Sequence, residues 1–188
     1  MGRVMTESPS ALAGELPGGV RIRLLRGSDA ERLGAAYRRN REHLAPWEPV
    51  RSAEFFAAEG QRANIAGKLA MFSAGAAVPW ILLQGDRAVG TMTLSGIVRG
   101  PFRSANLGYW VDQECTGRGV GTAAVAHVAA AAGTALELHR IQAATLPQNA
   151  ASQTVLRRAG FQQIGLAPEY LHIAGSWQDH VLFQRILH

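Results

Sequence analysis

The chain has 188 residues, of which 47% are hydrophobic and 18% charged, and its formal net charge is +5. This length and composition are those of one globular domain, and they exclude a largely disordered chain. A domain of this size buries roughly 70% of its unfolded surface, so a stable core requires neither a metal nor a disulfide. Cys115 is the only cysteine, which excludes a disulfide within the chain and favours a reducing, cytoplasmic compartment.

The sequence indicates neither a membrane span nor a nucleic-acid-binding segment. No run approaches the about 18 consecutive apolar residues of a membrane helix. Basic residues are scattered among acidic ones and form no Lys/Arg block, so we expect no direct nucleic-acid role, although a positive field attracts anionic substrates. Residues 1–19 are rich in Ser, Pro and Gly and are expected to form a flexible tail before a folded domain at residues 20–188.

The N-terminal half of the domain is expected to contain one strand and two helices. Residues 20–26 alternate between apolar and charged side chains, as in a half-buried strand. Residues 28–39 begin with Ser-Asp-Ala-Glu, the capping-box pattern of a helix start. Two prolines break residues 43–49 into a loop, after which Ser52 can cap a second helix that reaches about residue 73.

The C-terminal half reads mainly as strands. Residues 80–84 and 88–95 flank a Gly-Asp turn and predict a hairpin. The remaining elements are expected to be strands at 105–111 and 139–145, helices at 119–132 and 150–159, and final strands at 161–173 and 177–187. The order βααβββαβαββ indicates an α/β domain with one mixed sheet and helices on both of its faces.

A glycine-rich segment separates the strand at 105–111 from the helix that follows. It reads Gly117, Arg118, Gly119, Val120, Gly121 and Thr122. Glycines allow the backbone to approach a ligand closely, and a helix start carries unpaired N–H groups and the positive end of the helix dipole. This pattern favours an anion site suited to a pyrophosphate, with a glycine-rich turn that binds nothing as the alternative.

Two common phosphate-binding motifs do not fit this segment. A P-loop requires Gly-Lys-Ser/Thr, and the segment contains no lysine. A dinucleotide-binding fingerprint places its glycines directly after the first strand and an acidic residue at the end of the second. Here the glycines come late in the chain, and Glu137 precedes the next strand instead of ending it.

The segment resembles the acyl-CoA motif of the GNAT acetyltransferases, written Gln/Arg-x-x-Gly-x-Gly/Ala. Gly119 and Gly121 match its glycines, whereas Thr116 departs from its first position. Five further segments resemble the RimJ/RimL-type branch, which acetylates the N-termini of ribosomal proteins; they are residues 40–47, 138–141, 149–152, 158–161 and 170–180. The resemblance extends from about residue 20 to the end of the chain.

This resemblance implies a single GNAT domain with a mixed, mostly antiparallel sheet that is splayed at its centre, and acetyl-CoA as co-substrate. The strand that ends at Val111 would then supply an oxyanion donor through its last backbone N–H, a contribution of about 3 kcal/mol. For the side chains of Tyr109 and Trp110 ordinary strand packing is expected. The implied cofactor-binding residues are Tyr109, Trp110, Val111, Gly117, Arg118, Gly119, Val120, Gly121, Thr122, Asn149 and Ser152.

Three side chains are candidates for the chemistry. Asn149 and Ser152 lie one helical turn apart at a helix start, where either can be a plain cap. The resemblance implies that Asn149 binds the pantetheine amides and that Ser152 protonates or orients the leaving thiolate. Glu169 resembles the position of a proposed base, with a solvated surface carboxylate as the alternative. The six histidines show no metal-ligand spacing, so no metal is expected.

The function implied is direct transfer of acetyl from acetyl-CoA to a primary amine. A protein or peptide α-amine is favoured because its pKa of about 7.8, against about 10.4 for lysine, requires only a weak base. A small-molecule amine acceptor and a non-catalytic acyl-CoA-binding module remain alternatives, as does transfer of succinyl or another acyl group. A homodimer is compatible with the sequence.

Overall fold

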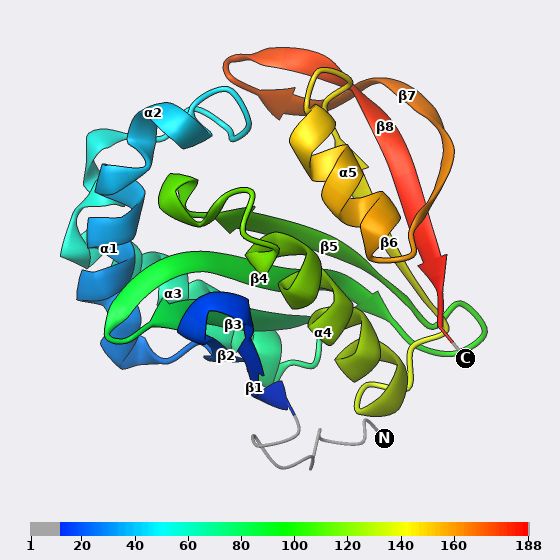
Figure 1. Cartoon of the computed structure of the whole chain (residues 1–188), viewed down its shortest axis with the longest axis horizontal. Helices are drawn as coiled ribbons and strands as arrows, with labels where there is room; N and C mark the ends of the chain where they lie inside the picture. The colour runs from blue at the N-terminus through cyan, green and yellow to red at the C-terminus, as the bar shows by residue number, and fades with distance from the viewer. Residues whose placement is uncertain (1–11, 188) are drawn as a thin grey trace.

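Eight strands form one mixed sheet in the order β1-β2-β3-β4-β5-β6-β8-β7 in the computed structural model, which describes residues 12–187 (Figure 1). The strands are β1 (Gly14–Leu16), β2 (Val20–Leu24), β3 (Ala77–Gln84), β4 (Arg87–Val98), β5 (Ser104–Val111), β6 (Arg140–Thr145), β7 (Gln162–Ile173) and β8 (Ser176–Ile186). Neighbouring strands are antiparallel except for β5 and β6, which are parallel. The predicted α/β architecture is confirmed.

Helices cover both faces of this sheet. They are α1 (Ala30–Arg39), α2 (Arg41–Leu44), α3 (Ala58–Ser73), α4 (Val120–Thr134) and α5 (Ala150–Arg158). Figure 1 shows α4 and α5 on one face, with α1 and α3 on the other. Successive side chains of a strand point to opposite faces, so Trp80 of β3 packs with the α4 side and Ile81 packs with the α1 side. The sheet therefore separates two apolar cores.

The sheet is splayed where β5 meets β6, as the resemblance predicts. Their recorded pairs are limited to residues 104–106 with residues 140–142. Beyond these pairs β5 continues to Val111, which pairs with Gly90 of β4 on its other side. Residues 107–111 therefore form an open edge of β5, with α4 and α5 beginning close to its end (Figure 1).

The structure corrects the expectation of a flexible tail for residues 12–19. β1 pairs with β2, and Leu12 is buried, with an exposed fraction of 2%. The indole Nε1 of Trp80 donates a 2.8 Å hydrogen bond to the Leu12 carbonyl oxygen. Three residues are too few for strand alternation to be recognised in a sequence. Residues 1–11 lie outside the described part of the chain.

Two expected helix starts also differ. α1 has no side-chain cap; the Asp29 carboxylate instead closes the 3-10 turn Gly27–Asp29 that precedes it, accepting from the Arg26 backbone N–H at 2.8 Å and from the Arg23 guanidinium at 2.6 and 2.8 Å. After Ser52 the chain forms a short 3-10 turn, Ala53–Phe56, and α3 begins only at Ala58. No described helix is both long and apolar enough to cross a membrane.

Because Leu12 is buried, a substitution there can test whether the segment that contains β1 contributes to the stability of the core. Leu12→Ala should lower the free energy of unfolding by about 2–4 kcal/mol, because it removes a buried side chain and leaves a cavity. Glu15→Ala, at an exposed position of β1, is the matched control and should change it by less than about 0.5 kcal/mol. Equal, negligible effects in chemical denaturation would show that this segment does not contribute to the core.

Candidate functional site

The glycine loop, residues 117–122, follows β5 and a short 3-10 turn, and its last three residues form the start of α4. Gly117 and Gly119 have φ of 72° and 78°, in the left-handed region that favours glycine. The first hydrogen bond into α4 runs from the Ala123 N–H to the Gly119 carbonyl oxygen at 3.0 Å. The N–H groups of residues 120–122 thus have no recorded acceptor in the described chain. These free donors at a helix start fit a pyrophosphate.

Gly121 has a different role from the other two glycines of the loop. A Cβ there would lie 3.5 Å from Val155 Cγ2 of α5 and 3.7 Å from Val111 Cγ2 of β5. At Gly117 and Gly119 a Cβ would meet nothing within 4 Å. The first turn of α4 therefore lies against α5 and β5 at Gly121, with room for ordinary contact by a Cβ, whereas the other two glycines shape a loop with open space beside it.

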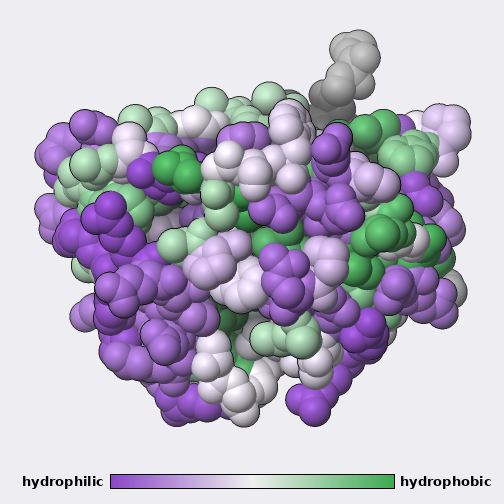
Figure 2. Space-filling view, turned by 90° about the horizontal axis from the view of Figure 1, so that it is seen from above, coloured by the Kyte–Doolittle hydropathy of each residue, from purple (hydrophilic) through white to green (hydrophobic). Residues whose placement is uncertain are grey.

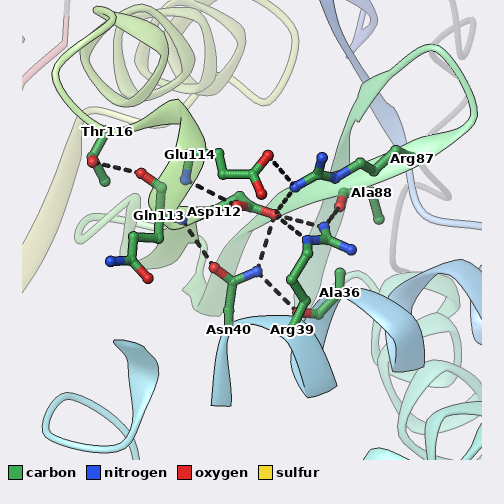
Figure 3. Close-up of polar contacts among 9 residues, drawn as sticks. All are labelled: Ala36, Arg39, Asn40, Arg87, Ala88, Asp112, Gln113, Glu114 and Thr116. Carbon is green, nitrogen blue, oxygen red and sulfur yellow. Dashed lines mark hydrogen bonds and ion pairs between the residues drawn. The ribbon is translucent and has the colours of Figure 1, made fainter. Parts of the chain in front are cut away.

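The carboxylate of Asp112, at the end of β5, organises the approach to the glycine loop (Figure 3). Asp112 has an exposed fraction of 1%. Its Oδ2 accepts from Arg39 Nε at 2.9 Å, Arg39 Nη2 at 2.5 Å, Asn40 Nδ2 at 3.0 Å and Arg87 Nη2 at 3.3 Å. Its Oδ1 accepts from the Glu114 backbone N–H at 3.0 Å. One buried carboxylate thus joins α1, β4 and the turn after β5.

Asn40 completes this cluster by bonding both to the carboxylate and to the turn. Its Oδ1 accepts from the Gln113 backbone N–H at 2.9 Å. Burial raises the pKa of Asp112, but hydrogen bonds from Asn40, Arg39 and the Glu114 backbone, with the attraction of Arg39, lower it to about 2. The stabilisation is therefore present above the unfolded pKa of about 3.9 and is lost as pH falls through about 2. No pattern in the sequence indicates this cluster.

Three of the expected site residues meet beside the open edge of β5. The Tyr109 hydroxyl lies 2.8 Å from Ser152 Oγ, and Asn149 Oδ1 accepts from the Ser152 backbone N–H at 3.0 Å. Asn149 is therefore the N-cap of α5, and its Nδ2 has no protein acceptor among the described residues. Burial raises the pKa of Tyr109 to about 12, although its hydrogen bond with Ser152 lowers it. The phenol is protonated at neutral pH.

The backbone of β5 presents its polar groups in alternation. The Asp112 N–H donates to the Val89 carbonyl oxygen of β4 at 2.8 Å, and the register pairs Trp110 with Thr91. Because N–H groups of an antiparallel strand alternate in direction, those of Tyr109 and Val111 face away from β4 and towards the open edge. Val111 is thus oriented as an oxyanion donor requires.

Trp110 is not brought to the open edge with its neighbours. Its indole Nε1 donates to the Tyr37 hydroxyl at 2.9 Å on the face covered by α1, and its exposed fraction is 7%. Its N–H faces β4, since it alternates with that of Val111. The side chain packs as expected, but neither it nor the backbone N–H is placed to contact a molecule at this edge.

Glu169 also lies apart from the Tyr109–Ser152 pair. It is exposed and has a φ of 44°, within an irregularity of β7 between Ala167 and Leu171. Its backbone N–H donates to Asp179 Oδ1 at 2.9 Å. Among the described residues no contact positions its side chain at the open edge. Arg118 and Thr122 retain their implied positions, exposed in the loop and half-buried in the first turn of α4.

A second carboxylate, missed by sequence analysis, lies in a pocket of about 180 Å³ on the α1 side. We call it the Glu48 pocket; its lining residues are Tyr37, Arg41, Leu44, Ala45, Glu48, Pro49, Val50, Arg51 and Phe56. Burial raises the pKa of Glu48, while Arg51 and Lys68 oppose that shift. The Ala174 N–H, in the turn between β7 and β8, donates to the Glu48 carbonyl oxygen at 3.1 Å. The sequence signal was an acidic residue between two prolines.

Figure 2 shows the molecule from the side on which α2 and the β7–β8 hairpin lie. Hydrophilic residues gather on its left half, the side of α1, α2 and α3 in Figure 1, and hydrophobic ones are more frequent on the right. The exposed apolar side chains of β7 and β8 include Ile164, Leu166, Tyr170, Leu171, Trp177 and Ile186. This side of the molecule therefore has one polar and one apolar flank.

The family described as "Acetyltransferase (GNAT) domain" matches residues 20–162. The chain belongs to this family. It is 35% identical over 163 residues to the [Ribosomal protein uS5]-alanine N-acetyltransferase of Escherichia coli K12, an alignment that covers 86% of this chain and 84% of that protein. The prediction of an acyl-CoA-dependent N-acetyltransferase is confirmed.

Solved GNAT structures share the whole arrangement. Ribosomal-protein-S5-alanine acetyltransferase from Vibrio fischeri superposes with a TM-score of 0.87 at 36% identity, covering 93% of this chain and 96% of that one. Mycobacterium smegmatis RimJ in complex with CoA-disulfide also gives a TM-score of 0.87, at 33% identity over 93% of this chain and 86% of that one. Coenzyme A binding by such relatives agrees with the free donors of the glycine loop. Within residues 12–187 of this GNAT chain, no group of three or more His, Cys, Asp or Glu side chains could hold a metal ion.

The backbone of the glycine loop can be tested at Gly119. Gly119→Ala places a side chain at a φ of 78° without a steric clash, a strain of about 1–2 kcal/mol that should displace the free N–H groups. We expect coenzyme A affinity, measured by calorimetry, to fall about tenfold, the equivalent of 1.4 kcal/mol.

Gly75→Ala is the matched control for this change. Gly75 has a φ of 71°, close to that of Gly119, and a Cβ at either position would meet nothing within 4 Å, but Gly75 lies in the turn after α3. It should show the same loss of stability with unchanged coenzyme A affinity. Unchanged affinity in Gly119→Ala would place the pyrophosphate elsewhere.

Proposed function

We propose that this GNAT enzyme transfers acetyl from acetyl-CoA to the α-amine of a protein N-terminus, with a ribosomal protein in the cytoplasm as the acceptor. The observation that carries the proposal is the open edge of β5, where the glycine loop and the Tyr109–Ser152 pair converge. The printed name of the relative from Escherichia coli, an alanine N-acetyltransferase of ribosomal protein uS5, supports the choice of acceptor.

On the donor side, the glycine loop would hold the pyrophosphate through the free N–H groups of residues 120–122 and the backbone at Gly117 and Gly119. The open edge of β5 offers backbone donors and acceptors to the amides of the pantetheine arm, as an added strand would. Asn149 fits the same arm, because its Oδ1 caps α5 while its Nδ2 stays available. The residues present are therefore suited to coenzyme A.

Acetyl transfer requires a neutral amine, a stabilised oxyanion and a proton for the departing thiolate. The Val111 N–H would stabilise the oxyanion, worth about 3 kcal/mol for one donor of this kind. Ser152 would deliver or orient the proton for sulfur, and the protonated Tyr109 hydroxyl holds Ser152 Oγ at 2.8 Å. Since a thiol has a pKa of about 8.5, this assistance accelerates the reaction without being indispensable.

The amine arrives mostly protonated and must lose one proton before attack. An α-amine with a pKa of about 7.8 is roughly one-third neutral at pH 7.5, whereas a lysine amine is about one-thousandth neutral. Glu169, the base implied by the resemblance, is exposed and no contact holds it at the open edge. An α-amine needs less help from a base than a lysine amine does, which favours it as the acceptor.

The acceptor can be identified with two matched peptide sets. One set has a free N-terminal alanine and no lysine; the other has a blocked N-terminus and a single lysine. With acetyl-CoA, mass spectrometry should show at least about tenfold faster acetylation of the first set, since its amine is neutral far more often. Faster modification of the lysine peptides would overturn the proposal, and reaction of neither set would indicate a small-molecule acceptor.

The role of the Tyr109–Ser152 pair can be tested by single and double substitution. Ser152→Ala should lower kcat about 10–100-fold with less than a twofold change in the acceptor KM, because it removes help to the leaving thiolate. Tyr109→Phe should have a smaller effect of the same kind. The double variant should resemble Ser152→Ala alone, since hydrogen-bonded partners are not additive.

Ser28→Ala, at an exposed position far from this pair in the sequence, provides the control and should behave as the wild type. A rise in acceptor KM with kcat preserved in Ser152→Ala would contradict a role on the donor side.

A further inference from the structure

The Glu48 pocket lies on the α1 side of the sheet, and Tyr37 links it to β5 near the strand's end. Tyr37 lines the pocket, and its hydroxyl accepts from Trp110 Nε1 at 2.9 Å. Trp110 adjoins Val111, whose N–H faces the open edge. Tyr109 and Trp110 are successive residues of a strand, so their side chains lie on opposite faces. The Tyr109–Ser152 pair and the Tyr37 side of the Glu48 pocket therefore lie on opposite faces of β5.

Charge in the pocket is arranged around a single carboxylate. Of the pocket's lining residues, Glu48 alone is acidic, with a side-chain exposed fraction of 20%. Arg51 Nε lies 3.6 Å from Glu48 Oε2, beyond hydrogen-bonding distance, so the pair is loose. The guanidinium groups of Arg51 and Arg41 lie over the rings of Phe55 and Phe56, at 4.5 and 4.7 Å from their centroids. Arg51 therefore divides its contacts between the Phe55 ring and the carboxylate, and it and Lys68 oppose the rise in the pKa of Glu48 that burial causes.

From this arrangement we infer that Glu48 is the carboxylate that receives the acceptor's α-ammonium and takes its proton, with the apolar pocket wall holding the first side chain. This inference rests on the function proposed above and assigns the acceptor half of its site. It replaces Glu169 as the base, because Glu48 lines a pocket whose Tyr37 is bonded to Trp110 of β5, whereas Glu169 is exposed in β7.

The pocket is small, with a volume of about 180 Å³. Pockets for drug-sized molecules span about 300–1,000 Å³. The space therefore suits one terminal residue with a small side chain, and the two arginines suit the carbonyl oxygens that follow it in a peptide.

The proton transfers balance as follows. The ammonium gives one N–H proton to the Glu48 carboxylate, and the freed lone pair forms the C–N bond to the thioester carbon. The C–S bond then breaks, and the second amine proton goes to sulfur through Ser152. Glu48 returns its proton to solvent, so each turnover yields the acetylated amine, free coenzyme A thiol and one proton.

The charged and titratable groups around Glu48 come from four elements. α1 contributes Tyr37, α2 contributes Arg41, the loop before the 3-10 turn contributes Arg51, and α3 contributes Lys68. Burial raises the pKa of Tyr37, keeping it neutral, and burial lowers the pKa of Lys68 although Glu48 opposes this. Burial likewise raises the pKa of Glu48, which brings the carboxylate closer in basicity to the amine that it must deprotonate.

The decisive experiment is the pH dependence of kcat/KM for Glu48→Gln, with a lysine-free peptide that begins with alanine. At pH about 6.5 the peptide is almost entirely an ammonium, and we expect a loss of about 100-fold. At pH about 9 the amine arrives neutral, so the loss should shrink to less than about fivefold. Wild-type and variant coenzyme A affinities, measured by calorimetry, should agree within twofold and show that the variant is folded.

Glu42→Gln is the matched control, because Glu42 is an exposed glutamate of the neighbouring α2. Its kinetics should match the wild type at every pH. Free alanine is the second probe and should react more slowly than the peptide, since it lacks the following carbonyl groups. Should Glu48→Gln not fold, Glu48→Asp keeps the charge and should retain a constant ratio to the wild type between pH 6.5 and 9.

The outcomes separate this inference from the function on which it rests. An active wild type with no loss in Glu48→Gln, or with the same loss at every pH, would overturn the role of Glu48 alone. A steep rise of the Glu48→Asp ratio with pH would do the same. A wild type that acetylates no peptide N-terminus, or prefers free alanine, would overturn the proposed acceptor itself.

Discussion

Hydrogen bonding between β5 and β6 stops after residues 104–106 have paired with residues 140–142, and the site exists because of this early end. An interior strand edge without a partner normally invites another strand to pair with it. Here the edge is short, lies between α4 and α5, and carries outward-facing N–H groups at Tyr109 and Val111. A substrate arm with amide groups can therefore bind inside the sheet and place its reacting carbon at the strand's end.

The geometry of that edge depends on one buried charge. Asp112 follows the last residue of β5 and is bonded to Arg39 and Asn40 at the end of α1 and to Arg87 of β4. Breaking one partner of such a cluster leaves a buried charge uncompensated. The cluster thus fixes the direction in which the chain leaves β5 and enters the glycine loop. It also holds α1, which carries Tyr37 of the Glu48 pocket, in a fixed position relative to β5.

Local patterns were sufficient to predict the order of the elements apart from β1 and α2, the glycine loop, and the place of Asn149 and Ser152 at the start of a helix. The first strand was missed because three residues show no periodicity, and its place depends on the contact between Leu12 and Trp80, 68 residues away. The Asp112 cluster could not be inferred for the same reason, since Arg39 and Asp112 are 73 residues apart. Trp110 was implied as a cofactor contact because the motif includes it together with its sequence neighbours Tyr109 and Val111. In a strand, however, successive side chains point to opposite faces, so Trp110 lies on the other face of the sheet from Tyr109.

The backbone hydrogen bond from Ala174 to Glu48 ties the turn between β7 and β8 to the segment that follows α2, two parts of the chain that are far apart in sequence. One hydrogen bond of this kind contributes only about 0.5–1.5 kcal/mol of net stability. The two segments can therefore separate while the sheet stays paired.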